Sequence, residues 1–292
     1  MAQREWAGTT YGNAWMHRTL IKVLRHTDVR LMYAFAAIFV VPVCLLLNDS
    51  RRVIYRYMRQ RHGMGRIKAA WKTYANHCMM SQLVIDRFAM YSGKRFDVKI
   101  EGYEHYRRLE LGKEGFVQLS SHVGNYEIAG YTLVARDKAF NAVVFGGEKE
   151  SVMAERINIL SRDNIRLILL EPDMSHIFAI NNALAQGEVV SMPADRIAGS
   201  NRYVEVTLLG ASARLPLGPF QVTTARGLEA LAVNVIKTAS KRYTVYVAPL
   251  NYDHSTPREE KVRQLAQAYT AELERILRIY PTQWYNFYDF WN

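Results

Sequence analysis

The sequence predicts an α/β fold: a mixed, mostly parallel sheet flanked by helices and preceded by a helical N-terminal element. The chain has 292 residues, of which 49% are hydrophobic, enough for a sizeable core. Residues 14–90 mix apolar and polar side chains at helical periods. From about residue 97, short apolar runs alternate with amphipathic stretches, which is typical of a sheet with helices packed against it. We therefore expect a helical element over 1–95 and an α/β domain over 96–292.

The most apolar run of the helical element is Leu31–Leu47. Its seventeen uncharged residues lie at the lower edge of the ~20 that a helix needs to span a bilayer. Pro42 is expected to interrupt the run, because proline lacks an amide hydrogen. A spanning helix and a buried or interfacial helix therefore both remain open. Further along, Gly63 and Gly65 indicate a break between two helices.

Positive charge is concentrated around this run. Residues 1–70 contain twelve Lys and Arg against three Asp and Glu, and so carry +9 of the formal net charge of +11. Each basic residue near an anionic lipid surface contributes on the order of 1 kcal/mol to binding. A basic stripe for nucleic acid is the other use of such a pattern. The adjacent apolar run favours lipid, and we expect no nucleic-acid partner.

The location of the chain follows from two further observations. Some thirty mostly polar residues precede the apolar run and no small-residue cleavage site follows it, which argues against a cleaved secretory signal. The two cysteines, Cys44 and Cys78, lie in separate apolar segments. They predict neither a disulfide framework nor a thiolate metal cage, and they fit a reducing compartment. We expect a cytoplasmic protein attached to the membrane by its N-terminal part.

The α/β part has regular punctuation. The last expected helix begins at Pro257 and ends just before Pro281, positions where proline commonly bounds a helix. Further helices are expected at about 124–136, 150–163, 174–186 and 218–228. The expected strands cover 96–102, 115–121, 141–147, 165–171, 188–195, 203–210 with 212–217, 231–238 and 242–250.

A histidine followed five residues later by a glutamate occurs three times, and context chooses among the pairs. His105 lies in a charged stretch expected to form a solvated helical turn, and His254 lies in a segment without glycine. His122 instead follows a predicted strand, in "SSHVGNYEIAG", with Glu127 in the first turn of the next helix. The loop between a strand end and a helix start is where α/β sheets commonly bind ligands.

A histidine and a carboxylate can together perform general-base chemistry. The imidazole takes a proton from an attacking hydroxyl or amine, while the carboxylate fixes its tautomer and stabilises the imidazolium. The nucleophile then belongs to the substrate. Ser120 and Ser121 lack the Gly-x-Ser-x-Gly setting of a serine nucleophile. No two-histidine helical motif or Cys/His cluster predicts a metal.

The segment "HVGNYE" resembles the His-x4-Asp/Glu motif of the glycerolipid acyltransferase superfamily, and the surrounding "SSHVGNYEIAG" more closely resembles the bacterial lipid A late acyltransferases. "GEVVSMPADR", "VEVTLLGASARLPLGPFQVTTARG" and "YPTQWYNF" resemble later segments of that family, in the same order. The resemblance implies an acyltransferase at the cytoplasmic face of the inner membrane. It would use an acyl carrier protein or coenzyme A thioester and a lipid or glycolipid acceptor, without a bound cofactor or metal.

The same resemblance suggests binding residues. Gly124 leaves room for backbone or ligand to approach, and with Asn125 it lies inside the motif. Asp195 ends the strand that resembles the family's acidic strand. Arg196 is expected either to pair with Asp195 at the surface or to bind a phosphate of the acyl carrier or acceptor.

The chain also departs from the family's pattern. It has "GGEKESVMAERINILSRDN" where an Asn-Pro pair and a downstream arginine are usual, so Glu148 and Arg156 are the candidates there, with Arg162 in reserve. The final segment, "WYNFYDFW", carries Asp289 where the family has a basic residue. These differences suggest a divergent branch, one that acylates an amino-lipid or another envelope molecule. Two interpretations of the final aromatics stay open, a cap on the core and an interfacial belt.

Two other functions remain as alternatives. A non-catalytic basic protein would bind anionic lipid or nucleic acid through residues 14–70. A serine hydrolase would use Ser121.

Overall fold

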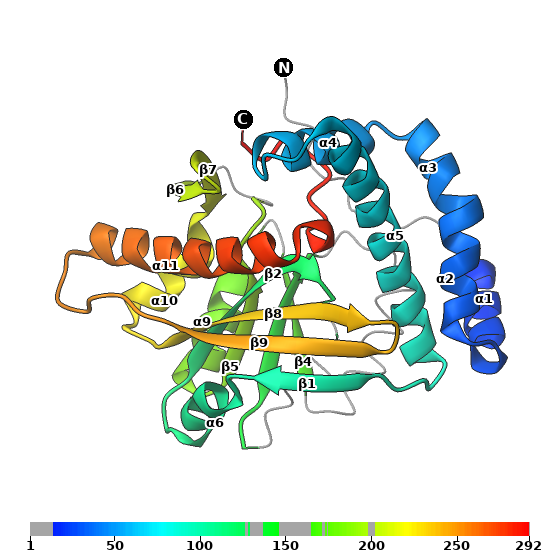
Figure 1. Ribbon diagram of the computed structural model, residues 1–292. Coiled ribbons are helices and arrows are strands. Elements are labelled where there is room, and N and C mark those ends of the chain that lie inside the picture. The colour runs from blue at the N-terminus through cyan, green and yellow to red at the C-terminus, as the bar shows by residue number, and fades with distance from the viewer. Residues whose placement is uncertain are drawn as a thin grey trace.

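The computed structural model of the protein describes residues 14–125, 128, 137–145, 165–170, 173, 175–197 and 202–291. Helices enclose a twisted sheet, and the chain's C-terminal end lies beside the N-terminal helices (Figure 1). The helical elements are α1 (Ala14–His26), α2 (Val29–Phe35), a π-helical turn (Ala36–Val40), α3 (Val41–Leu47), α4 (Ser50–Gln60), α5 (Arg66–Tyr91), α6 (Tyr103–Leu111), α9 (Ser175–Ala185), α10 (Leu217–Ala225), α11 (Arg258–Ile279) and a 3₁₀ turn (Pro281–Gln283). The strands are β1 (Asp97–Glu101), β2 (Phe116–Gly124), β3 (Phe140–Phe145), β4 (Ile165–Leu170), β5 (Val189–Pro193), β6 (Tyr203–Leu208), β7 (Ala211–Pro216), β8 (Ala230–Ala239) and β9 (Arg242–Leu250).

Seven of the described strands form one sheet in the order β1-β9-β8-β2-β5-β3-β4. Every neighbouring pair is parallel except β8 and β9, which form an antiparallel hairpin. Strands β6 and β7 form a separate two-stranded antiparallel unit. The sheet is therefore mixed and mostly parallel, which confirms the predicted fold class. Its central strand, β2, is buried along almost its whole length, as both faces of such a sheet are covered.

The two faces of the sheet carry separate cores. Apolar residues of α9, α10 and α11 pack with the strands on one face, where Ile180, Phe220 and Leu273 are all buried. On the other face, Tyr106 and Leu109 of α6 pack against Phe116 and its neighbours. The stretch around His105, expected to be a solvated helical turn, is thus a full helix with one buried face. The helices expected at 124–136 and 150–163 fall almost entirely outside the described residues.

The apolar run forms a helix that continues through proline. Residues 29–47 are helical throughout, and the π-helical turn ends at Val40, two residues before Pro42. The expected interruption at Pro42 is therefore wrong. The wider π-helical turn before the proline lets the helix continue although proline has no amide hydrogen to donate. This helix is the one stretch within the described part of the chain that is long and apolar enough to cross a membrane, and 22% of its most apolar part is buried. It packs beside α5 at the edge of the molecule (Figure 1).

A buried polar network joins this helix to the sheet. Asp86 of α5 and Lys237 of β8 form an ion pair of 2.5 Å, with side chains 0% and 5% exposed. The hydroxyls of Tyr33 on α2 and Tyr243 on β9 both donate to Asp86, and the ammonium of Lys237 donates to the Tyr33 hydroxyl at 2.9 Å. A buried charge is costly without partners, and in this network each charged group has them; the contacts tie α2 and α5 to strands β8 and β9. The predicted boundary between a helical element over 1–95 and an α/β domain over 96–292 stays a prediction.

Candidate active site

The strand that carries His122 bulges where the histidine lies. Strand β2 follows β8 in parallel register from Val117 to Ser120, but the register shifts between Ser120 and Gly124. The pairing of β2 with β5 also ends at Ser120. A bulge turns side chains away from the regular alternation of a strand and is common beside active sites. Here it leaves the imidazole of His122 20% exposed in an otherwise buried strand.

His122 is held by Asp195, which follows the neighbouring strand β5. The Nδ1 atom of His122 lies 2.7 Å from Oδ1 of Asp195, and the backbone amide of His122 donates to Oδ2 at 2.9 Å. The two residues meet because β2 and β5 are parallel, which places their carboxyl ends at the same edge of the sheet. Ala194 also donates its amide to the Ser120 carbonyl at 2.9 Å, fixing the two chain segments to each other.

The charge of Asp195 is set by its surroundings. The side chain is 0% exposed, and burial alone would raise its pKa. The charge of His122, the hydrogen bonds from His122 and the charge of Arg196 outweigh burial and hold the pKa of Asp195 at about 2. The carboxylate is therefore ionised at neutral pH and accepts from Nδ1–H. Nε2 is then the ring nitrogen of His122 that can accept a proton.

A third donor to Asp195 comes from the end of the chain. The indole Nε1 of Trp284 donates to Oδ2 of Asp195 at 3.1 Å. The backbone amide of Tyr285 donates to the carbonyl of His122 at 3.2 Å, and Val123 and Trp284 form an isolated antiparallel bridge. The sequence marked this segment by its family likeness and its run of aromatics, but it predicted no contact with Asp195. The available signal was the tryptophan after Pro281, an aromatic with a polar edge that needs a partner when buried.

Gly124 closes the bulge by letting two backbones touch. Its φ is +59°, and a Cβ there would lie 1.8 Å from the carbonyl oxygen of Val235 on β8. The amide of Asn125 donates to that same carbonyl at 2.8 Å. Asn125 is 1% exposed, and its side chain lies close to the Tyr243 hydroxyl. The close approach predicted at Gly124 is thus an approach of backbone; contact of Gly124 or Asn125 with substrate stays a prediction.

Arg196 holds the C-terminal segment. Its Nε donates to Oδ1 of Asn286, and one terminal nitrogen donates to the carbonyl of Tyr285, each at 2.7 Å. The carboxylate of Asp195 is meanwhile taken by His122 and Trp284. These contacts therefore do not show the expected surface ion pair between Arg196 and Asp195. The phosphate-binding role of Arg196 stays a prediction.

A family model described as bacterial lipid A biosynthesis acyltransferase matches residues 60–292, most of the chain. The chain belongs to this family. A lipid A biosynthesis acyltransferase transfers an acyl group to a lipid acceptor, and the family is typically associated with membranes. No protein with a curated record matches the chain. Among solved structures, the chain is similar to the 1-acyl-sn-glycerophosphate acyltransferase PlsC of Thermotoga maritima, with 13% identity over 89% of this chain and 98% of that one, at a TM-score of 0.34.

Several predicted site residues of this acyltransferase lie outside the described residues. These are Glu127 in the motif and the candidates Glu148, Arg156 and Arg162. Among the described residues, the carboxylate that contacts the His122 imidazole is that of Asp195. The sequence predicted Asp195 near the site but did not predict this contact. Ser121 is 2% exposed and donates to Oδ1 of Asn234 at 2.6 Å, a structural role that does not suit a nucleophile.

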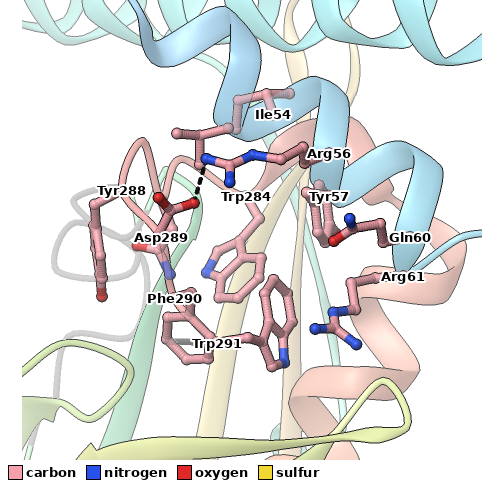
Figure 2. A pocket seen from close by; sticks show the side chains of 12 residues that line it. Ile54, Arg56, Tyr57, Gln60, Arg61, Trp284, Tyr288, Asp289, Phe290 and Trp291 are labelled. Carbon is pink, nitrogen blue, oxygen red and sulfur yellow. Dashed lines mark hydrogen bonds and ion pairs between the residues drawn. The ribbon is translucent and has the colours of Figure 1, made fainter.

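Asp289, which stands where the family has a basic residue, pairs with a basic residue from another part of this chain. Asp289 forms an ion pair of 2.6 Å with Arg56 of α4 (Figure 2). The two residues line a small cavity of about 80 Å³ between α4 and the C-terminal segment. Trp284 and Trp291 pack against Tyr57 on the inner side of this cavity, and Phe290 packs against Trp284. Trp284 and Phe290 are buried, at 2% and 7%, so these aromatics belong to the core.

Proposed function

We propose that this family member transfers a fatty acyl group from an acyl thioester to a hydroxyl or amine of a lipid or glycolipid acceptor. The donor is an acyl carrier protein or coenzyme A thioester, and the acceptor is a lipid A-like molecule or an amino-lipid. The single observation that carries the proposal is the contact between His122 Nδ1 and Asp195, at a bulge where the imidazole remains accessible. No cofactor or metal takes part in the proposed reaction.

The proposed reaction moves one proton through His122. Nε2 accepts the proton of the acceptor's hydroxyl or amine as the oxygen or nitrogen attacks the thioester carbonyl. Asp195 stabilises the imidazolium that forms, and the family motif assigns Glu127 a share in orienting the ring. The tetrahedral intermediate then collapses, the carbon–sulfur bond breaks, and the departing thiolate takes the proton from Nε2. The nucleophile belongs to the acceptor, so no acyl-enzyme forms.

The membrane attachment of the proposed enzyme fits the exposed surface of its N-terminal helices. Leu31, Ile38 and Leu46 on the apolar helix are 66%, 63% and 76% exposed, an arrangement suited to lipid contact. Basic residues follow directly on α4. We place the enzyme at the cytoplasmic face of the plasma (inner) membrane, where anionic lipid and acyl thioesters meet.

The test is the variant His122→Ala, assayed by mass comparison of lipids from cells with and without the protein. The wild type should add a species heavier by one acyl group, which also identifies the acceptor. Loss of the general base typically costs 10²- to 10⁴-fold in rate. His105→Ala is the matched control, because His105 also precedes a glutamate by five residues but lies on α6.

We expect His105→Ala to retain full activity and His122→Ala to lose it while remaining folded and membrane-bound. Retention of more than about a tenth of the wild-type rate by His122→Ala would refute the assignment. Full function in that variant would instead favour the non-catalytic alternative, in which the N-terminal helices alone matter.

A further inference from the structure

A second cavity lies at the junction of α3, α4 and α5, separate from the imidazole. Its volume is about 520 Å³, within the range of sites for small molecules and lipid tails. It is bounded by the end of the apolar helix, the first two turns of α4 and the second and third turns of α5. The residues that line it are Leu45, Arg51, Arg52, Tyr55, Arg56, Ala70, Thr73 and Tyr74.

The inner wall of this cavity is apolar. The hydroxyl of Tyr74 donates to the carbonyl of Ala37 at 2.8 Å, and the hydroxyl of Thr73 donates to the carbonyl of Ala69 at 2.8 Å. Both polar groups are thus satisfied inside the protein. Together with Leu45 and Ala70, the wall offers hydrocarbon to whatever occupies the cavity, which suits an acyl chain.

Three arginines line the same cavity. Arg51 donates to the carbonyls of Leu45 and Leu46, so its charge is held at the end of the apolar helix. Arg52 lies 3.4 Å from Asp49, and Arg56 lies 2.6 Å from Asp289. The side chains of both pairs are between 43% and 71% exposed. Exposed ion pairs contribute little free energy, so an incoming anion can replace either carboxylate at low cost.

The residues around the cavity are also both basic and apolar. Residues 45–74 contain eight Lys and Arg against one acidic residue, Asp49. Near the cavity's lining residues, large apolar side chains point into solvent: Leu46, Leu47, Ile67 and Trp71 are between 66% and 88% exposed. A hollow with an apolar wall, arginines among the residues that line it and exposed hydrophobic side chains nearby matches the boundary between lipid headgroups and acyl chains.

We propose that this cavity binds one anionic phospholipid molecule from the membrane. Its phosphate diester lies between Arg52 and Arg56, which are one helical turn apart on α4. One acyl chain enters along Leu45 and Ala70. An acidic carrier protein would meet the same arginines, but it would use neither the hollow nor the exposed apolar side chains. The site is a lipid-binding site in its own right and does not depend on His122.

The experiment measures phospholipid retained by the full-length protein. The protein is bound to vesicles of phosphatidylcholine alone or of equal parts phosphatidylcholine and phosphatidylglycerol, released in mild detergent and examined by native mass spectrometry. We expect one retained phosphatidylglycerol and no retained phosphatidylcholine. Arg52→Gln/Arg56→Gln should weaken retention by at least about tenfold, since two charge-assisted hydrogen bonds are lost. Ala70→Trp should do the same by filling the cavity, because Ala70 is exposed there and the larger ring has room.

Lys68→Gln/Lys72→Gln is the matched control. It removes two positive charges from the neighbouring helix α5 without touching the residues that line the cavity. Equal loss in both double variants would mean diffuse surface attraction and would overturn the proposal, as would unchanged retention in Ala70→Trp. Displacement of the lipid by an acyl carrier protein would reassign the arginines to a protein partner. His122→Ala should retain the lipid fully. Lipid retention and acyl transfer therefore test the two proposals independently.

Discussion

The indole nitrogen of Trp284 donates a hydrogen bond to Oδ2 of Asp195 at 3.1 Å, while Oδ1 of the same carboxylate lies 2.7 Å from Nδ1 of His122. A residue eight positions from the C-terminal end of this sequence thus helps to orient a side chain near its middle. Ordered donors on both oxygens leave the carboxylate little freedom to rotate. The imidazole is therefore positioned before any substrate arrives, which is the condition for efficient general-base catalysis.

Asp195→Asn should reduce the acyl transfer rate by about 10²- to 10⁴-fold in a protein that still folds but has a lower thermal midpoint, because the stabilising charge interactions of Asp195 are lost. Asparagine has nearly the same shape but carries no charge, so the imidazolium loses its counter-ion and the tautomer of His122 is no longer fixed. Steady-state transfer and the thermal midpoint in detergent measure the two effects. Asp253→Asn, in the exposed loop before α11, is the control and should keep full activity. Near-normal turnover in Asp195→Asn would remove Asp195 from the mechanism.

Trp284→Phe should lower the free energy of unfolding by about 1.5–3 kcal/mol, because a hydrogen bond to an ionised group is lost while the aromatic packing stays. Trp291→Phe is the matched control, since its Nε1 donates to the neutral carbonyl of Leu208 at 3.2 Å. That loss should cost about 0.5–1.5 kcal/mol. Denaturant unfolding in detergent compares the two. If Trp291→Phe proved the more damaging, the special role of Trp284 would be wrong.

The stability of the fold should depend on pH through Asp195. Its pKa is about 2 in the folded protein, below the ordinary value of 3.8. Because the folded-state pKa is depressed, the stabilisation is complete above about pH 4 and is lost as the pH falls toward 2. The advantage of the wild type over Asp195→Asn in unfolding free energy should shrink by about 2 kcal/mol across that window. A difference that stays constant with pH would contradict the assigned charge state.

Gly124→Ala should prevent correct folding, since its Cβ would collide with the Val235 carbonyl at 1.8 Å and φ is +59°. Gly210→Ala separates the two causes, because Gly210 has φ +76° but nothing within 4 Å of an added Cβ. That variant should lose about 1 kcal/mol, from backbone strain alone. Soluble yield and circular dichroism measure both. A folded, active Gly124→Ala would show that the bulge is more plastic than its geometry implies.

The sequence determined the class of the fold, and it selected His122 as the candidate general base. Alternating apolar runs and amphipathic stretches placed the described strands correctly, because hydrophobic period is a local property of the chain. His122 was selected from local context, a strand predicted to end at Ser121 and a glycine at position 124; in the structure β2 continues through His122 to Gly124. The apolar run with its basic flanks was equally visible in the sequence.

Tertiary structure alone decided which groups surround that histidine. Asp195 lies 73 residues from His122 and Trp284 lies 89 residues from Asp195, and both contacts exist only because parallel strands bring their ends together and the chain returns after α11. The register shift in β2 and the cavity beside Arg52 and Arg56 have the same origin. Contacts between distant segments depend on strand order and helix docking, which are set by packing over the whole domain. They produce no periodic pattern in the local sequence from which they could be predicted.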